Sequence, residues 1–409
     1  MARRIVITGL GAISPIGSNV EENWNSCIFG KSGIEIIDSQ WVNNLNSKIA
    51  GLIKIDPLEK LDKVQARRMD RSSQLGVIAV REAWNDAGIP EINPERLGVF
   101  FGSGIGGLST VLEQYEVLKQ RGPDRVNPMT VPMIMPNSAA AMVGLEIGAQ
   151  AGVHSPVSAC ATSAEAIAGG YEMIKNNQAD IVVTGGAEAC VVQLAIAAFS
   201  SMRALSTNNE HPHKASRPYD ISRDGFVMSE GAAALVLEEE QHALRRGAKI
   251  YGVVAGAGMS SDGYHIAAPE PEGKGAARAI TKALHNAGIK ASDVSHINAH
   301  ATSTPVGDVA ESKAMNLALG KDLENIIVSA TKSMTGHLLG GAGALESIFS
   351  VLALKSGKAP GTLNLDNKDA SINLNVFKVT QNLDSNANYA LNNSFGFGGH
   401  NVCVVFAKN

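Results

Sequence analysis

Short β-branched segments alternate with alanine-rich segments along most of this chain. The alanine-rich stretches are long enough for helices, and alternation of strands and helices predicts a layered α/β protein. The predicted strands lie at residues 5–8, 97–101, 181–184, 233–237, 250–254, 296–299, 326–330 and 402–406.

Three pairs of similar segments occur in the same order in the two parts of the chain. AWNDAGI at 83–89 resembles ALHNAGI at 283–289, and LGVFFGSGIGG at 97–107 and SHINAHATSTPVG at 295–307 follow them. RRIVITGLGAIS near the start resembles AKIYGVVAGAGMSSD at 248–262. Chance similarity among small residues is the alternative, but three ordered matches favour a duplication. The sequence therefore predicts two similar halves, 1–248 and 249–409, with a catalytic cleft that draws residues from both.

Composition and charge narrow the class of protein. The 409 residues are 44% hydrophobic and 18% charged, and the net charge of −4 argues against general nucleic-acid binding. Four cysteines, Cys27, Cys160, Cys190 and Cys403, lie far apart without a Cys-x-x-Cys pair, which fits a reducing cytosol. The first apolar segment is too short for a signal peptide, and no stretch approaches about 18 apolar residues. We therefore expect a cytoplasmic protein without a membrane span.

Cys160 lies between a strand-like run at 153–159 and a predicted helix at 163–176. Unpaired backbone N–H groups and the positive end of the helix dipole at such a turn favour the thiolate, which is the nucleophilic form. Small alanines leave room for a substrate carbonyl, and Ser163 is a candidate helix cap. The alternative is a small buried hydrophobe, which is the usual state of a free cysteine and the one we expect for the other three.

His300 and His337 each lie in a loop rich in Gly, Ser and Thr that follows an apolar run. Two neutral imidazole N–H groups aimed at one oxygen would stabilise an enolate, as decarboxylation of a malonyl thioester requires. Either histidine alone could equally be structural. His265 is a candidate for the entrance of the site, whereas the His211 and His213 pair has no further ligand at metal-binding spacing.

The segment NNSFGFGGHN at 392–401 is rich in glycine around Phe397. Glycines permit positive φ and close backbone approach, so the Phe397 amide could pair with the Cys160 amide as an oxyanion hole. The alternative is a tight turn between core strands.

Taken together, these segments resemble the β-ketoacyl-acyl-carrier-protein synthases among the thiolase-like condensing enzymes. The resemblance runs along nearly the whole chain through VITGLGAISPIG, FGSGIGG, VSACATSAEAI, VTGGAEA, RPYDISRDGFVMSEGA, NAHATSTPVGD, TKSMTGHLLGGAGALE and NNSFGFGGHN. It implies a five-layered αβαβα fold made of two duplicated halves, and a homodimer.

The resemblance also implies a role for individual residues. Cys160 matches the nucleophile, His300 and His337 complete the Cys-His-His set, and Lys332 pairs with the buried acid Glu346. Phe397 matches the residue that gates the acyl site and gives the oxyanion amide. The matches that bind substrate are Ile105 and Phe199 at the acyl pocket and Thr302 and Thr304 at the phosphopantetheine arm. Ala301 departs from the family, in which many members have glycine, and we expect the extra methyl group to be tolerated.

The implied reaction has two stages. Cys160 takes an acyl chain from an acyl carrier protein, and a malonyl carrier protein then loses CO₂ and attacks the acyl thioester. The type II elongating members have a branched residue where this chain has Ile105, whereas type I relatives tend to have glycine. The phosphopantetheine arrives on the carrier protein, so no bound cofactor and no catalytic metal are expected. A structural monovalent cation near Asn298 and Glu346 is possible.

Because carrier proteins are acidic, a basic docking patch is expected. Lys63, Arg67 and Arg71 at spacings of four would share one helix face, with Arg68 beside them. Arg203, together with Arg121 and Arg125, would extend the patch. An ordinary solvated charged face is the alternative.

Three rival functions are less well supported. A dinucleotide fingerprint at Gly9 and Gly11 lacks its third glycine, because Ser14 stands there. A thiolase would need a second cysteine in the C-terminal glycine-rich loop. An inactive chain-length partner of a polyketide synthase would lack the nucleophile that this chain retains.

Overall fold

The computed structural model describes residues 3–88 and 91–409, in which one large mixed sheet forms the frame. Its strand order is β12-β10-β9-β14-β15-β8-β1-β7-β6-β4-β5. The strands are β1 (Ile5–Ile13), β4 (Leu97–Gly102), β5 (Gly152–His154), β6 (Ile181–Glu188), β7 (Gly231–Glu239), β8 (Gly252–Ser261), β9 (Val294–Asn298), β10 (Ile327–Ser329), β12 (Asn375–Val376), β14 (Tyr389–Gly396) and β15 (His400–Ala407). Two small ribbons pair β2 (Ile34–Ile36) with β3 (Ile49–Gly51) and β11 (Lys358–Ala359) with β13 (Gln381–Asn382).

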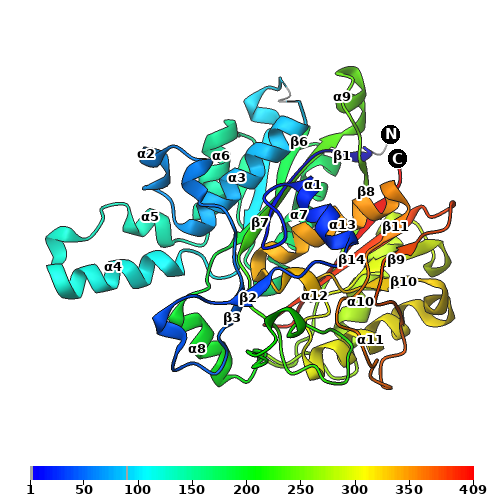
Figure 1. Cartoon of the computed structure of the whole chain (residues 1–409). Helices are drawn as coiled ribbons and strands as arrows, with labels where there is room; N and C mark the ends of the chain where they lie inside the picture. Colours follow the sequence, from blue (N-terminus) through cyan, green and yellow to red (C-terminus); the bar gives the residue numbers. More distant parts are fainter. Residues whose placement is uncertain (1–2, 89–90) are drawn as a thin grey trace.

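Helices cover both outer faces of the sheet and fill the space between its two halves (Figure 1). They are α1 (Val20–Ile28), α2 (Lys63–Ala66), α3 (Arg71–Asp86), α4 (Leu108–Arg121), α5 (Thr130–Ile134), α6 (Ser138–Ile147), α7 (Thr162–Lys175), α8 (Gln193–Ser201), α9 (Glu240–Arg245), α10 (Lys274–Ala287), α11 (Pro305–Leu319), α12 (Lys332–Thr335) and α13 (Ala342–Ser356). Two 3₁₀ turns, η5 (Ala159–Ala161) and η9 (Leu339–Gly341), lead into α7 and α13.

The contacts between elements give five layers. Helices α3 and α6 pack on the outer face of the β1-to-β5 half, and α10 with α11 pack on the outer face of the β8-to-β12 half. Helices α7 and α13 contact each other and strands of both halves, so they form the central layer. The five-layered αβαβα fold that the resemblance implies is confirmed. In Figure 1, α4 and α5 project away from these layers.

The two halves have the same strand order. The order β1-β7-β6-β4-β5 corresponds to β8-β15-β14-β9-β10, with the connecting helices in equivalent places. Each half also has a bulge at the same point, between Ile7 and Gly9 in β1 and between Val254 and Gly256 in β8. The repeated segments fall on these equivalent elements, although Ile89 of the first repeat lies outside the described residues. The division of the chain at residue 248 stays a prediction.

The repeated glycines of the two first strands have a packing role. A Cβ added to Gly11 would lie 1.9 Å from the carbonyl oxygen of Ala79 on α3. A Cβ added to Gly258 would lie 2.2 Å from the carbonyl oxygen of Ala279 on α10. Both helices therefore touch the strand backbone. Because Gly9 and Gly11 lie within buried β1 rather than in a turn before a helix, the dinucleotide-binding alternative is wrong.

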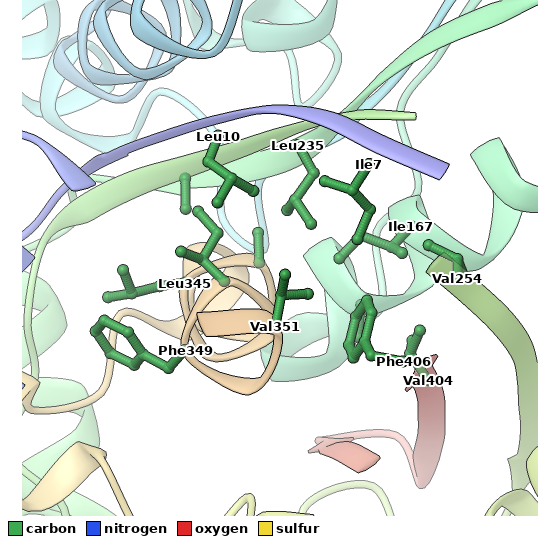
Figure 2. Close-up of a cluster of buried hydrophobic side chains, with 14 of the residues drawn as sticks. Ile7, Leu10, Ile167, Leu235, Val254, Leu345, Phe349, Val351, Val404 and Phe406 are labelled. Atoms are coloured by element: carbon green, nitrogen blue, oxygen red, sulfur yellow. The ribbon is translucent and has the colours of Figure 1, made fainter. Parts of the chain in front are cut away.

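The largest hydrophobic cluster lies around the central layer (Figure 2). Ile7 and Leu235 from β1 and β7 face Phe349 of α13, and Phe406 of β15 closes the cluster from the other half. Each of these side chains is fully buried or nearly so. This shared core holds the two halves together, so that loops from both can meet at one fixed site.

Candidate active site

Cys160, His300 and His337 line one cavity of about 580 Å³. Cys160 is the central residue of η5, His300 follows β9, and His337 follows α12. The two imidazole rings lie 5.4 Å apart between centroids and at 84° to each other. The structure thus brings together the three side chains that the sequence proposed, from loops of both halves.

The turn at Cys160 contains a strained backbone position. Ala159 has φ of +50°, a left-handed conformation that is rare for a residue with a side chain. The Thr162 hydroxyl donates to the Ala159 carbonyl at 2.7 Å and accepts the Ser158 N–H at 3.0 Å, which holds the turn closed. Ser163 does not cap α7 as predicted: its hydroxyl accepts the Ala344 N–H at 2.9 Å and joins α7 to α13.

The glycine-rich tail reaches the same turn. A Cβ on Gly396 would lie 2.3 Å from the Ser158 carbonyl oxygen and 3.2 Å from the Cys160 nitrogen, so only glycine fits there. Gly398 adopts a positive φ of 84°, as the sequence predicted for this loop. Phe397 follows Gly396 directly, and its backbone N–H lowers the pKa of the Cys160 thiol, so the Phe397 amide lies on the side of the cavity that holds the sulfur.

Burial raises the pKa of the Cys160 thiol to about 12, although the nearby Lys332 charge and the Phe397 N–H lower it. The predicted preference for thiolate in the resting site is therefore wrong. A helix dipole contributes at most about 2 kcal/mol, or about 1.5 pKa units, which is less than this rise. Helix α7 begins close to the predicted position. The burial of the Cys160 sulfur, however, depends on residues that are far away in the sequence.

This pKa leads to a prediction for alkylation. At neutral pH the thiol form dominates, so the thiolate fraction and the rate of iodoacetamide alkylation at Cys160 should rise about tenfold per pH unit. The rise should continue past the pKa of about 8.5 of an ordinary thiol. Mass-spectrometric quantification of alkylated Cys160 against pH tests this, and a plateau in the rate at or below about pH 9 would contradict it.

The two histidines are held neutral. Burial lowers the pKa of His300 and His337 well below the ordinary value, and the positive charge of Lys332 lowers both further. Neither ring has a protein hydrogen-bond partner at Nδ1, and His337 has none at Nε2. Both histidines line the cavity as neutral rings, and a neutral imidazole N–H can donate a hydrogen bond to an oxygen that gains negative charge.

Lys332 and Glu346 form a buried ion pair behind the histidines. Lys332 begins α12 and Glu346 lies on α13, and both side chains are almost fully buried. Burial raises the pKa of Glu346 to about 7, and Lys332 opposes this rise. The pair therefore sets the charge next to both rings.

The loop that carries His300 is fixed by Glu311 of α11. The Glu311 carboxylate accepts the backbone N–H of His300 at 2.8 Å and that of Ala301 at 2.7 Å. Ala301 has φ of +31°, which explains why glycine suits this position, and its methyl group is buried in a hydrophobic cluster of the C-terminal half.

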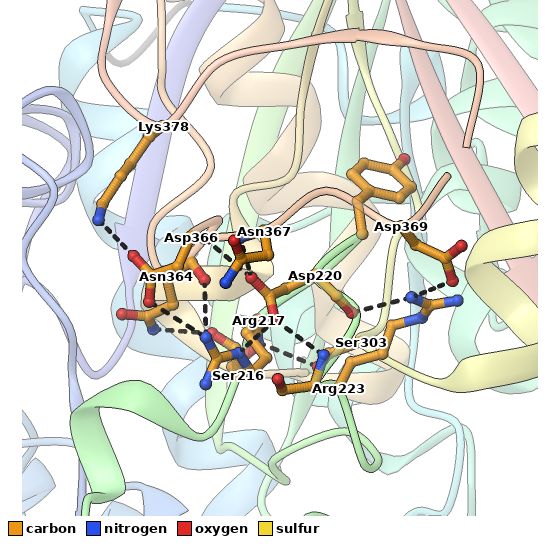
Figure 3. A network of polar contacts seen from close by, with 12 residues as sticks. Ser216, Arg217, Asp220, Arg223, Ser303, Asn364, Asp366, Asn367, Asp369 and Lys378 are labelled. Atoms are coloured by element: carbon orange, nitrogen blue, oxygen red, sulfur yellow. Dashed lines mark hydrogen bonds and ion pairs between the residues drawn. The ribbon is translucent and has the colours of Figure 1, made fainter. Parts of the chain in front are cut away.

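A polar network anchors the other end of this loop (Figure 3). Arg223 donates to the Thr304 and Pro305 carbonyls and pairs with Asp308 and Asp369. The neighbouring Asp220 carboxylate accepts the backbone N–H groups of the 366–367 turn. The network therefore fixes the start of α11 beside the cavity.

The predicted substrate residues lie around the cavity. Ile105, Phe199 and Phe397 line its apolar part, and the Phe199 and Phe397 rings are 6.3 Å apart. Thr302 and Thr304 line the polar part with their hydroxyl oxygens 3.1 Å apart, and Thr304 also caps α11. His265 lines the cavity as expected.

Sequence reasoning missed several residues of the site. Phe226 packs edge-to-face against His337 and Phe199, with ring centroids 5.4 Å apart in both pairs. Phe395 packs against His300, and Glu311 holds the His300 loop. Phe226 lies in RPYDISRDGFVMSEGA, whose match to the family was the available signal. A buried carboxylate such as Glu311 gives no signal of its own.

The predicted docking face is wrong in its geometry. Helix α2 ends at Ala66 and α3 begins at Arg71, so Lys63, Arg67 and Arg71 do not share one helix. Arg71 also makes two 2.7 Å hydrogen bonds to Glu230. Lys63, Arg67 and Arg68 are exposed, and Arg203 is exposed where it lines the cavity.

The described residues contain no cluster of three or more His, Cys, Asp or Glu side chains able to hold a metal. Around Asn298, however, two buried acceptors lack a donor: Glu346 Oε2 and Asn392 Oδ1. Oxygen ligands of this kind fit a hard cation. Within residues 3–88 and 91–409, no helix is both long and apolar enough to cross a bilayer.

Comparison with known proteins gives consistent matches. The family models described as "Beta-ketoacyl synthase, N-terminal domain" and "Beta-ketoacyl synthase, C-terminal domain" match residues 2–243 and 251–366. The chain is 44% identical over 409 residues to "3-oxoacyl-[acyl-carrier-protein] synthase 2" of Synechocystis sp., covering 99% of this chain and 98% of the relative. It is also 44% identical over 410 residues to the Staphylococcus aureus protein of the same name, with the same coverage.

Two solved structures superpose along the full length of both chains. One is a β-ketoacyl synthase from Burkholderia phymatum STM815, at 33% identity and a TM-score of 0.91. The other is AntDE:AntF, described as a type II PKS acyl-carrier protein in complex with its ketosynthase bound to the hexaketide, at 30% identity and a TM-score of 0.91.

Proposed function

The chain belongs to the β-ketoacyl synthase family, and on that premise we propose that it elongates acyl chains as a 3-oxoacyl-[acyl-carrier-protein] synthase. The 44% identity to relatives of that name over nearly the whole chain supports this activity. The observation that carries the mechanism is the convergence of Cys160, His300 and His337 on one cavity.

In the first stage, the Cys160 sulfur attacks the thioester carbon of an acyl carrier protein. The bond between the thioester carbon and the sulfur of the carrier's phosphopantetheine breaks as the bond to Cys160 forms, and the proton lost by the Cys160 thiol ends on the departing phosphopantetheine thiol. The Cys160 and Phe397 amides would donate to the oxygen of the tetrahedral intermediate, a role that the closeness of Gly396 to the Cys160 nitrogen supports. The acyl chain then occupies the apolar part of the cavity beside Ile105 and Phe199.

In the second stage, malonyl carrier protein places its thioester oxygen between the two imidazoles. Loss of CO₂ leaves its electron pair in an enolate, which the neutral N–H groups of His300 and His337 stabilise. The enolate carbon attacks the acyl thioester, the bond to Cys160 breaks, and a 3-oxoacyl chain two carbons longer leaves on the carrier. Thr302 and Thr304 would bind the phosphopantetheine arm, and their position in the cavity lining supports this role.

An elongation assay tests this proposal. Purified protein with acyl and malonyl carrier proteins should release CO₂ and form a 3-oxoacyl carrier protein two carbons longer, detected by mass spectrometry of the carrier. Thiolysis or an inactive-partner role would give no such product. The one cysteine downstream of the glycine-rich tail, Cys403, is fully buried in β15, which disfavours thiolase chemistry.

Acyl carrier protein is the proposed partner, and Lys63, Arg67, Arg68 and Arg203 give the exposed positive charge for docking. Charge reversal at Arg67 and Arg68 should raise KM for carrier-bound substrate about tenfold or more at low salt, because it opposes electrostatic association. Steady-state kinetics with carrier proteins and with short thioester mimics measure this. Reversal of the exposed Arg245 and Lys321 is the matched control. Equal KM values for the Arg67/Arg68 and control variants would remove this surface from the proposal.

A homodimer fits the free edge of the sheet. Among the described strands, the terminal strand β5 pairs with β4 alone, and Val153 within it and Val157 just after it are exposed apolar side chains. Free edges and contiguous apolar surface favour pairing with a second copy. Sedimentation should give twice the chain mass of 42.7 kDa, and a monomer at assay concentration would contradict this. The cytoplasmic location stays a prediction from the sequence.

A monovalent cation near Asn298 and Glu346 would satisfy the buried acceptors that lack donors. It would serve structure rather than the chemistry of the thioester. The unfolding temperature should be higher in sodium or potassium chloride than in choline chloride of equal ionic strength. Identical unfolding temperatures in the three salts would argue against the site.

A further inference from the structure

Glu188, the last residue of β6, is a fully buried carboxylate that the proposed reaction does not use. No basic side chain pairs with it among the ion pairs of the described residues. Instead, its oxygens accept four hydrogen bonds: from the Ser103 hydroxyl at 2.8 Å and from the N–H groups of Gly104 at 2.9 Å, Ile105 at 3.3 Å and Gly340 at 3.1 Å. Burial raises its pKa to about 7, and these donors lower it.

The four donors come from two loops that both border the active-site cavity. The first loop follows β4 and carries Ile105, which lines the cavity. The second loop runs from His337 to α13 and includes Gly340. A Cβ on either Gly104 or Gly340 would lie within 2.9 Å of Glu188 Oε2, so both loops press directly on the carboxylate. Glu188 is therefore the common anchor of the acyl-pocket loop and a histidine loop.

The duplication explains why a carboxylate fits there. Glu188 pairs with the first residue of β7, as Gly396 at the end of β14 pairs with the first residue of β15. Gly340 is the middle residue of η9, as Cys160 is of η5, and the residues before them, Leu339 and Ala159, have φ of +46° and +50°. The Cys160 amide of one half thus has its counterpart in the Gly340 amide of the other half, and the Gly340 amide donates to the Glu188 carboxylate.

We propose that Glu188 is a positioning residue for acyl-chain selection, because it locks the Ile105 loop to the loop that follows His337. This inference rests on the proposed function, since it concerns how the same cavity measures its acyl chain. Without the anchor, the Ile105 loop is free to move, and the floor of the apolar part of the cavity is no longer fixed.

The test is the chain-length profile of Glu188→Gln. The glutamine amide replaces one acceptor oxygen by a donor that faces other N–H groups, so at least one loop is released. The ratio of kcat/KM for long over short acyl carriers should change by about tenfold or more, which is the scale of one methylene in an apolar pocket. Malonyl decarboxylation, which needs the histidines, should stay within about twofold. Ser103→Ala removes one donor and should shift the profile in the same direction by less.

The rate of Cys160 alkylation is a second measurement, which distinguishes the effect of the Glu188 charge from a purely structural effect. The Glu188 charge raises the pKa of Cys160, so Glu188→Gln should increase the rate of Cys160 alkylation at mildly alkaline pH. Glu82→Gln is the matched control, because Glu82 is a partly buried carboxylate that accepts two backbone N–H groups, from Ala12 and Val20, outside the cavity. The control should leave both the profile and the alkylation rate unchanged.

Two results would overturn the inference. One is a wild-type length profile in both Glu188→Gln and Ser103→Ala. The other is a parallel loss of decarboxylation and of elongation at every chain length, which is the behaviour of a purely structural residue. Failure of the proposed function itself is recognised separately, because the wild-type protein would then form no acyl-enzyme at all.

Discussion

Replacing Cys160 by alanine should abolish chain elongation while malonyl decarboxylation continues. Among the described residues that line the cavity, none besides Cys160 carries a thiol, so no acyl-enzyme forms and elongation should fall by at least about 10³-fold. The imidazoles that stabilise the enolate remain in place, because Cys160 does not hold either ring. CO₂ release from malonyl carrier protein and formation of 3-oxoacyl carrier protein are measured in parallel.

Cys403→Ala is the control for this experiment. Cys403 is also a free thiol, but it lies fully buried in β15 and away from the cavity lining. The control should elongate at the wild-type rate. If Cys160→Ala elongated as well as Cys403→Ala, another group would have to carry the acyl chain.

Replacing His300 or His337 by alanine should lower malonyl decarboxylation by about 10²–10³-fold each, which is the usual loss for one donor to a developing oxyanion. The physical reason is that both rings are neutral and their nitrogens lack protein partners, so each is free to donate to the enolate. The double variant should lose less than the product of the two single losses, since the two donors act on one oxygen.

Acyl loading separates this effect from a damaged fold. Both histidine variants should still accept an acyl chain on Cys160, because the amides of Cys160 and Phe397 remain. His337→Gln, which keeps a neutral N–H donor, should recover part of the decarboxylation rate. Unchanged decarboxylation in the alanine variants would rule out the enolate role.

The positions of the three central residues could be predicted because each has a local signal. Cys160 precedes a helix after an apolar run, and the two histidines follow apolar runs in small-residue loops. The repeated segments also predicted the duplication, because the glycines of β1 and β8 are required by the same helix contact in each half. These features could be predicted because the signal for each of them lies in residues that are close together in the sequence.

Other features depended on partners that the sequence does not place. The raised pKa of Cys160 comes from burial by segments that are distant in the sequence. In the sequence, Glu188 and Glu311 do not differ from surface acids, because the sequence does not show that loop N–H groups donate to them. The prediction that Lys63, Arg67 and Arg71 share one helix face is wrong because of two helix caps. Asp62 and Asp70 each cap a helix start, so the segment from Lys63 to Arg71 holds two helices rather than one.

The most direct test of this account is to locate the acyl group after incubating the protein with a labelled acyl carrier protein. Peptide mass spectrometry should find the label on Cys160 alone, and subsequent addition of malonyl carrier protein should remove it as a chain two carbons longer. A label on another residue, or a Cys160 adduct that malonyl carrier protein leaves in place, would contradict the account.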